Sequence, residues 1–249
     1  KYTGEEISPK LKRVIEQMAQ KGATLHLMSS LYVIAWLLNV RGGDISYVPV
    51  VLSYLALSQD SCIWFLQEEV VTETLKAYLD KNGIQTRPYD DFYEYVKHID
   101  EKETVLLNTS IVNYRICDSL PDGVKVIDAE DPTVVMKAVK NEVQLENLRK
   151  AHLKDAVAMC KFMYWLKTNI GKIPMTEISA SDYLASLRAE QEGFLDLSFA
   201  TICGYADHGA IVHYSATEES DRQLKPESLL LVDSGGHYLE GTTDITRTF

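Results

Sequence analysis

The sequence predicts an α/β protein of 249 residues that is organised as two domains. Helical and strand patterns alternate over about the first 130 residues, which is typical of an open sheet flanked by helices. Beyond Lys140 the pattern changes to one long helical stretch followed by short β-like segments. We therefore expect an α/β domain over residues 1–135 and a second, α+β domain over residues 136–249.

A helix is expected to open the chain, with Ser8 and Pro9 in its first turn and Gly22 at its end. A short buried helix is expected at residues 30–40, because the segment is almost wholly apolar and Arg41-Gly42-Gly43 ends it. The other expected helices of the first domain are at residues 71–81, 90–98 and 111–119. Strands are expected at residues 23–28, 51–57, 62–67, 104–107 and 124–127.

The second domain is expected to start with a long helix over residues 140–166, whose broad apolar stripe indicates core packing. A second helix is expected at residues 177–191. The β-like segments that follow lie at residues 195–202, 209–215, 229–236 and 244–249.

Composition excludes several classes of protein. A net charge of -11 and the absence of a basic run argue against a nucleic-acid partner. The longest apolar run, residues 31–40, is far short of the ~20 residues of a membrane-spanning helix, and the N-terminus has no export signal. The four cysteines are scattered through apolar stretches and are expected to be reduced core thiols: Cys62, Cys117, Cys160 and Cys203. We expect a cytoplasmic protein.

Two aspartates bracket a glycine-rich connection near the end of the chain. Asp233 ends one apolar strand and Asp244 starts the next. If the hairpin is centred between Tyr238 and Leu239, the two aspartates are direct cross-strand neighbours, with Cβ atoms roughly 4.5 to 5.5 Å apart. Carboxylates that close repel unless a proton or cation lies between them, and hard oxygen ligands suit Mg²⁺, Ca²⁺ or Mn²⁺. The same spacing also suits two aspartates that serve only as turn formers and caps.

His213 is the strongest histidine candidate. Its segment, residues 209–215, is expected to be a short strand in which Ala210, Ile211 and Val212 pack inward while the imidazole reaches a cleft. There it could shuttle a proton or donate to a developing oxyanion, although a histidine beside apolar residues is commonly structural. The common zincin, serine hydrolase and P-loop motifs do not occur.

The run DSGGHYLEGTTDITRT, preceded by GAIVHYS, closely resembles the active-site strands of the aminopeptidase P, prolidase and creatinase family. Residues 140–152, 198–202 and 35–42 also resemble segments of the long aminopeptidase P proteins. The resemblance implies a creatinase-N-like α/β domain followed by the N-terminal half of a pita-bread catalytic domain. Two smaller differences from the family are Ala200 and His208, which replace a common Pro and Asn.

The resemblance also implies chemistry. In that family two divalent metals, usually Mn²⁺ with Zn²⁺ or Co²⁺ as alternatives, are held by two Asp, one His and two Glu. Asp233 matches the Asp that ligates one metal, Asp244 the Asp that bridges both, and His213 the His that lines the substrate site. The implied activity is removal of the N-terminal residue from Xaa-Pro peptides by metal-hydroxide attack, in a protein that is commonly a homodimer.

The remaining His and Glu ligands of the family follow the TRT strand, so we expect this chain to be a truncated piece that is inactive alone and binds Mn²⁺ weakly or not at all. Two other functions stay open at this point. One is a prolidase-type Xaa-Pro dipeptidase. The other is a non-catalytic pita-bread module that binds proteins, against which the retained Asp233, Asp244 and His213 count, because a buried carboxylate pair is costly without a cation.

Overall fold

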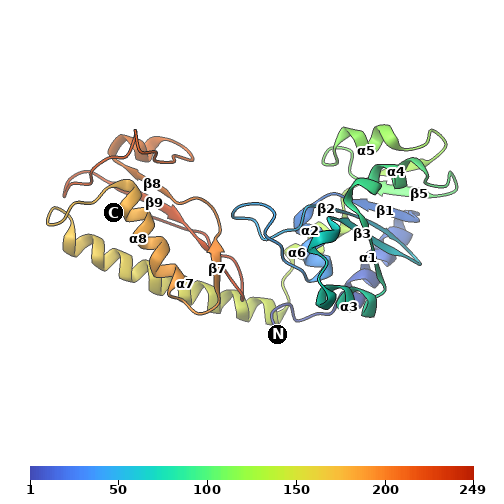
Figure 1. The fold of residues 1–249 in the computed structure, drawn as a ribbon, viewed down its shortest axis with the longest axis horizontal. Coiled ribbons are helices and arrows are strands. Elements are labelled where there is room, and N and C mark those ends of the chain that lie inside the picture. Colours follow the sequence, from blue (N-terminus) through green and yellow to red (C-terminus); the bar gives the residue numbers. More distant parts are fainter. The chain divides into compact units, whose positions relative to one another are not determined.

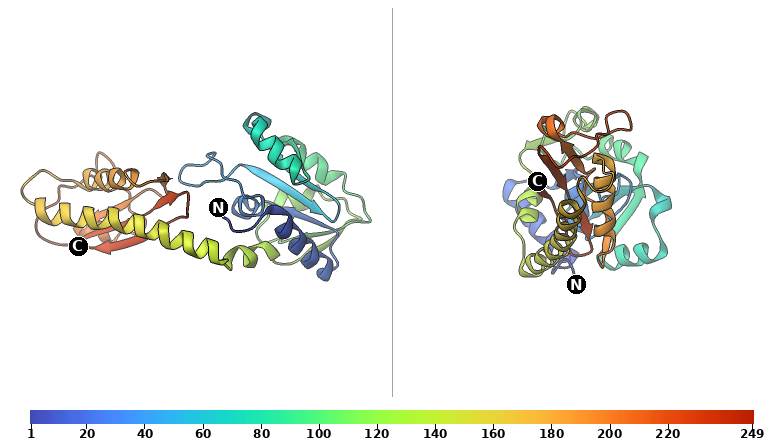
Figure 2. Two further views of the ribbon diagram at one scale, coloured as in Figure 1. Left: turned by 90° about the horizontal axis from the view of Figure 1, so that it is seen from below. Right: turned by 90° about the vertical axis from the view of Figure 1, so that its left-hand side faces the viewer.

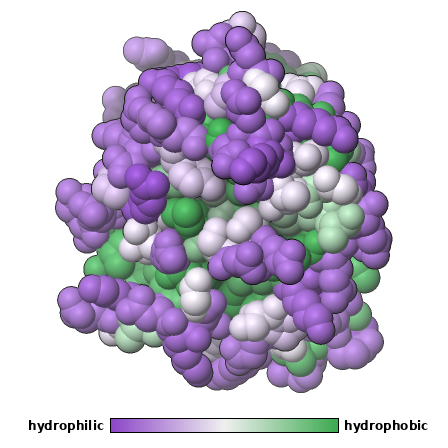
Figure 3. Space-filling view, turned by 90° about the vertical axis from the view of Figure 1, so that its right-hand side faces the viewer, coloured by the Kyte–Doolittle hydropathy of each residue, from purple (hydrophilic) through white to green (hydrophobic).

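The computed structural model describes residues 1–249, which form two compact units. The first unit is Glu5–Lys140, and the second unit is Asn141–Phe249 together with Lys1–Gly4. Each unit has its own hydrophobic core. No helix of either unit is both long enough and apolar enough to cross a membrane. Hydrophilic side chains cover most of the face shown in Figure 3, with smaller apolar areas between them.

The first unit is built on a six-stranded mixed sheet with the strand order β4-β3-β2-β1-β5-β6 (Figure 1). Strands β1, β2 and β3 pair antiparallel, whereas β4, β5 and β6 pair parallel with their neighbours. The strands are β1 Leu25–Met28, β2 Ser53–Ser58, β3 Cys62–Leu66, β4 Ile84–Pro88, β5 Thr104–Leu107 and β6 Lys125–Asp128. The predicted open α/β sheet is therefore confirmed, with β4 as a strand that the sequence pattern did not reveal.

Helices cover both faces of this sheet, which explains why its strands are apolar in consecutive positions. Leu55 and Trp64 belong to the core on one face, while Tyr54 and Phe65 belong to the core on the other. The helices are α1 Ile7–Lys21, α2 Leu31–Leu38, α3 Glu73–Lys81, α4 Phe92–Lys97, α5 Tyr114–Ser119 and α6 Pro132–Ala138. Short 3₁₀ turns occupy Glu68–Val70 and Tyr89–Asp91.

Helix α1 begins at Ile7, slightly before the predicted Ser8-Pro9 start, and is capped as predicted by Gly22, which has a φ of 78°. Helix α2 is capped by Asn39, whose φ is 53°. The buried ammonium of Lys10 donates to the backbone oxygen of Trp36 and lies 2.5 Å from Oδ1 of Asn39. A cation at this position interacts favourably with the negative, C-terminal end of the α2 dipole. Asn39, within the segment at residues 35–42, therefore both caps α2 and contacts Lys10.

The second unit packs two helices on one face of a small antiparallel sheet. Helix α7, Glu142–Asn169, runs beside α8, Glu177–Ala189, and both are visible in Figure 2 as the yellow and orange helices. The sheet has the order β11-β9-β8, and a separate pair joins β10 to β7. These strands are β7 Phe194–Leu197, β8 Ile202–Tyr205, β9 Leu230–Ser234, β10 Gly236–Tyr238 and β11 Ile245–Thr248.

The N-terminal tail of the chain belongs to this second unit. Asn141, which caps α7, donates from its side chain to the backbone oxygen of Thr3 at 2.9 Å. The side chain of Asn147 donates to the backbone oxygen of Lys1 at 3.2 Å. The start of α7 is therefore tied to the start of the chain.

Several predictions about the second unit are wrong. The segment with His213 is not a strand: Ala206–Ala210 forms a 3₁₀ turn, η3, and a further turn follows. The apolar stripe of α7 is only partly core, because Val157 is 42% exposed and Tyr164 is 75% exposed. Cys160 lies on the same exposed surface and is no core thiol, whereas Cys62 and Cys203 are buried as expected.

Candidate metal centre

The hairpin that carries the two aspartates has a different register from the predicted one. Asp233 pairs with Thr246, so facing residues have numbers that sum to 479, whereas the prediction required 477. The backbone hydrogen bonds between Tyr238 and Gly241 close the turn around Leu239 and Glu240. The physical reason lies in Tyr238, which cannot occupy the turn because it is fully buried.

Asp233 and Asp244 are consequently diagonal neighbours and not directly opposed. Asp244 lies two residues before Thr246, the partner of Asp233, so both aspartates belong to the same face of the sheet. Burial raises the pKa of Asp244, and the charge of Asp233 and a hydrogen bond to it raise that pKa further. The two carboxyl groups therefore lie near enough to interact electrostatically, although the direct cross-strand pairing was wrong.

The carboxylate pair has the chemistry that a hard cation requires. Oδ1 of Asp233 is buried and has no hydrogen-bond partner, which is costly unless another group satisfies it. Carboxylate oxygens suit Mg²⁺, Ca²⁺ and Mn²⁺. No third His, Cys, Asp or Glu joins the pair to form a larger cluster. The donor set thus fits part of a divalent metal site.

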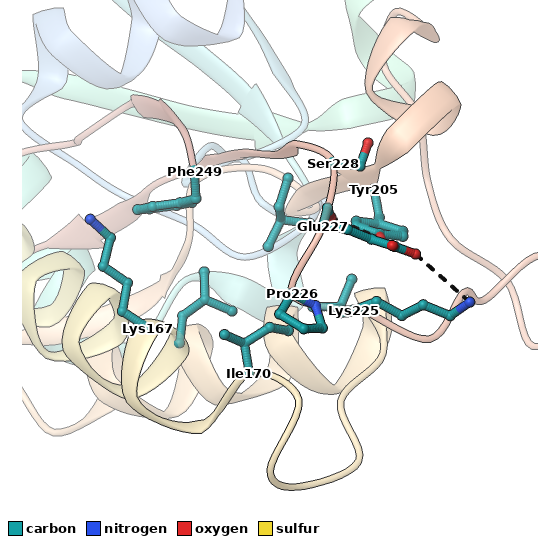
Figure 4. Close-up of a pocket in the computed structure, with 11 residues that line it drawn as sticks. Lys167, Ile170, Tyr205, Lys225, Pro226, Glu227, Ser228 and Phe249 are labelled. Atoms are coloured by element: carbon teal, nitrogen blue, oxygen red, sulfur yellow. Dashed lines mark hydrogen bonds and ion pairs between the residues drawn. The ribbon is translucent and has the colours of Figure 1, made fainter.

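The carboxylates lie on the sheet face opposite to the helices. Leu230 and Val232 of β9 are buried in the core with α7 and α8, so the alternating Asp233 side chain points the other way. A cavity of about 170 Å³ lies on the helix face, between α7, β8 and the segment that leads into β9 (Figure 4). Its lining contains none of the three predicted site residues, so this cavity is a separate feature of the second unit.

His213 is carried by a segment that lies over the carboxylate face. A Cβ atom on Gly204 of β8 would lie 2.9 Å from the backbone nitrogen of Gly209 in η3, so the absence of side chains lets η3 approach the sheet. Gly209 in turn packs near Leu231, which shares the face of Asp233. His213 follows η3 in an exposed turn with a φ of 55°.

The predicted inward packing around His213 is wrong, because Ile211 is 52% exposed and Val212 is 83% exposed. The buried residue of the segment is Tyr214 instead. The structure thus brings Asp233 and Asp244 together and places the His213 turn after a segment on the same sheet face. No histidine lies close enough to the two carboxylates to form a three-residue metal cluster with them.

Sequence reasoning missed a buried glutamate beneath this segment. Glu177, the first residue of α8, is fully buried, and its carboxylate accepts hydrogen bonds from four donors far along the chain. The donors are the backbone of Tyr205 at 2.7 Å, Nδ1 of His208 at 2.9 Å, the hydroxyl of Tyr214 at 2.9 Å and the backbone of Arg222 at 3.2 Å. No local motif signals this role, because every donor lies at least 28 positions away.

Comparison with known proteins covers the whole chain. Residues 1–144 match the Creatinase/Prolidase N-terminal domain, and residues 146–249 match metallopeptidase family M24. Over its full length the chain is 34% identical to a probable Xaa-Pro aminopeptidase P of Sordaria macrospora, of which it covers 42%. It is 35% identical to Xaa-Pro aminopeptidase 1 of Dictyostelium discoideum, of which it covers 40%. The chain therefore spans about 40% of the length of these curated relatives.

Solved structures give the same picture. X-prolyl aminopeptidase from Caenorhabditis elegans, described as a cytosolic enzyme with a di-nuclear active site, superposes with a TM-score of 0.93 at 31% identity. All of this chain and 42% of that chain are covered. An Xaa-Pro dipeptidase from Bacillus anthracis superposes with a TM-score of 0.75 at 16% identity, over 98% of this chain and 65% of its own, which shows a shared fold alone.

Proposed function

The chain belongs to the creatinase/prolidase/aminopeptidase P family of metallopeptidases, and on that basis we propose that the protein is a metal-dependent aminopeptidase that removes the N-terminal residue from Xaa-Pro peptides. The predicted fold class, a creatinase-N-like α/β domain followed by part of a pita-bread domain, is confirmed by the likeness to the Caenorhabditis elegans enzyme. The activity assigned here is that of the curated relatives, whose names specify Xaa-Pro peptides.

The observation that carries the proposal is the placement of Asp233 and Asp244 as diagonal neighbours on one sheet face, with Oδ1 of Asp233 buried and without a hydrogen-bond partner. We assign both as ligands of divalent metal, with Asp244 bridging two ions. Bound metal would act as a Lewis acid that polarises the scissile carbonyl. The buried, unpartnered Oδ1 of Asp233 supports this assignment, because a ligated cation satisfies a carboxylate that hydrogen bonds leave unsatisfied.

His213 is proposed to line the substrate site and to donate a hydrogen bond to the oxyanion that develops on the scissile carbonyl. Its exposed turn follows η3, which packs on the sheet face that bears Asp233. The proposed metal is Mn²⁺, with Zn²⁺ or Co²⁺ as alternatives. A cytoplasmic location, a homodimeric state and the lack of nucleic-acid and membrane partners complete the proposal; the neighbour from Caenorhabditis elegans is described as cytosolic.

A hydrolysis assay on the full-length protein tests this function. Tripeptides of the form Xaa-Pro-Yaa should be cleaved after the first residue in the presence of Mn²⁺, and a chelator should abolish cleavage. Asp233→Asn and Asp244→Asn should each lower kcat by about 100- to 1,000-fold, because a metal contributes several kcal/mol of transition-state stabilisation. Asp182→Asn is the matched control, because Asp182 is an exposed aspartate on α8.

Two outcomes would contradict the proposal. Normal cleavage by Asp244→Asn would exclude the bridging role, and cleavage of Xaa-Pro dipeptides without cleavage of longer peptides would identify a prolidase-type dipeptidase instead.

The 249-residue chain alone should bind Mn²⁺ only weakly, with a Kd of roughly 10⁻⁴ M or higher, because two carboxylates supply few of the oxygen ligands that such cations take. Paramagnetic resonance of free Mn²⁺ measures that affinity directly.

A further inference from the structure

Glu177 organises the whole segment that carries His213. Its four donors span the segment: Tyr205 starts it, Arg222 ends it, and His208 and Tyr214 lie on either side of His213. Oε1 accepts from the Tyr205 backbone and from Nδ1 of His208, which also lies 3.1 Å from Oε2, while Oε2 accepts from the Tyr214 hydroxyl and the Arg222 backbone. An ionised carboxylate has about four acceptor positions, so this set of donors is complete.

The two side-chain donors have defined orientations. Nε2 of His208 lies 2.9 Å from Nη2 of Arg222. A guanidinium can only donate, so Nε2 must accept, and the proton of the neutral imidazole is on Nδ1, which donates to Glu177. The Arg222 guanidinium also pairs with Asp207, so it is held in place from its other side.

Glu177 also connects the end of the segment to the start of α8. It is the first residue of α8, a helix of 13 residues, where the helix dipole stabilises negative charge. Its own backbone N–H donates to the backbone oxygen of Arg222 at 3.1 Å, and the next N–H, of Ile178, donates to Asp221 at 3.0 Å. The end of the segment is therefore attached to α8 through both backbone and side chain.

His213 itself makes none of these contacts, yet its neighbour Tyr214 is buried and hydrogen-bonded to Glu177. With the Tyr214 side chain directed into the unit and His213 at a φ of 55°, the imidazole is left on the exposed side of the turn. We infer that Glu177 is a positioning residue that acts through His213. This inference rests on the proposed function and adds to it a residue outside the metal site.

Glu177→Gln tests the inference, since it keeps the shape of the side chain and replaces one acceptor oxygen by an NH₂ group that faces donors. In the full-length enzyme we expect kcat to fall about 10- to 100-fold, because a misplaced group can cost about 100-fold. KM and metal content should be unchanged. Tyr214→Phe, which removes one donor, should shift kcat in the same direction by less.

The decisive measurement is a double-mutant cycle with His213→Ala. If Glu177 acts through His213, the double variant should be no slower than His213→Ala alone. A purely structural role would instead multiply the two losses, and that result would overturn the inference while leaving the proposed function intact. Tyr238→Phe is the control, because it removes a buried hydrogen bond of the same unit outside this segment, and its effect should multiply with that of His213→Ala.

Hydrogen exchange on the 249-residue chain provides a readout that is independent of activity. Glu177→Gln should speed amide exchange over residues 205–222 and leave the centre of α7 protected. Unchanged exchange over that segment would overturn the inference. A full-length wild type that cleaves no Xaa-Pro peptide would overturn the proposed function, and with it the role of Glu177 in that reaction, whereas the exchange data would still decide the anchoring.

Discussion

The Nε atom of Arg188 lies 2.6 Å from Oδ1 of Asp155, and both side chains are buried. A second contact joins Nη2 of Arg188 to Oδ2 of Asp155 at 3.2 Å, so the pair is bidentate. The hydroxyl of Tyr238 donates to the same Oδ1 at 3.0 Å. This ion pair therefore links α7, α8 and the hairpin of the two aspartates, and it holds Tyr238 out of the hairpin turn.

Removal of the carboxylate should be strongly destabilising. Asp155→Ala leaves the Arg188 charge buried without a partner, and we expect a loss of about 3 to 5 kcal/mol in the free energy of unfolding. Asp182→Ala, an exposed change on α8, should stay within about 0.5 kcal/mol. Urea denaturation followed by circular dichroism measures both. A loss under about 1 kcal/mol for Asp155→Ala would show that the pair contributes little.

Gly235 should tolerate no side chain. A Cβ atom there would lie 2.0 Å from the backbone oxygen of Thr243 and 2.4 Å from Oγ of Ser198, so Gly235→Ala must separate the strands that hold Asp233 and Asp244. We expect a destabilisation of about 1 to 3 kcal/mol. Gly43→Ala meets no atom within 4 Å and provides the control. Equal melting temperatures for the two variants would contradict the observed hairpin.

Lys10 should make stability depend on alkaline pH. Burial lowers the pKa of Lys10 from its usual value near 10.5 to about 8. Between about pH 8 and pH 10 the unfolded chain therefore binds more protons than the folded chain, so this group makes the free energy of unfolding rise with pH, by about 2 kcal/mol. Lys10→Met should lack that rise. Parallel pH profiles for wild type and variant would refute the shifted pKa.

The thiols should differ sharply in reactivity. Burial raises the pKa of Cys62 and of Cys203 to about 12, so both should react with a disulfide reagent only after unfolding. Cys160 is exposed on α7 and should react in the folded protein. Mass spectrometry after brief labelling distinguishes these sites, and Cys160→Ser should remove the fast phase. Rapid labelling of Cys203 would mean that the core of the second unit opens readily.

Elements with strong periodicity were predictable from the sequence, because their burial pattern is local. Helix α7 and strand β5 are examples. Strand β4 was missed because Gln85 and Thr86 are exposed and polar at the sheet edge. The apolar residues of the 209–215 segment predict a buried strand, whereas Val212 is 83% exposed and the segment forms turns.

The candidate site was predictable only in part. The spacing of Asp233 and Asp244 indicated that they meet, but the register depended on the burial of Tyr238 beside Asp155, which lies 83 positions away. Glu177 gave no signal, since its partners come from 28 to 45 positions further along the chain. Long-range hydrogen bonds of this kind are set by tertiary packing and leave no periodic trace in the sequence.

The hydrogen bonds between the N-terminal tail and α7 join residues that are far apart in the sequence, which bears on the order of folding. Thr3 and Asn141 are 138 positions apart, so forming their hydrogen bond from an unfolded chain would require closing a very long loop. If residues 5–140 fold first, the two ends of that loop are already fixed to one body, and the remaining entropy cost is small. We therefore expect the tail to dock onto the start of α7 late, after the first unit has folded.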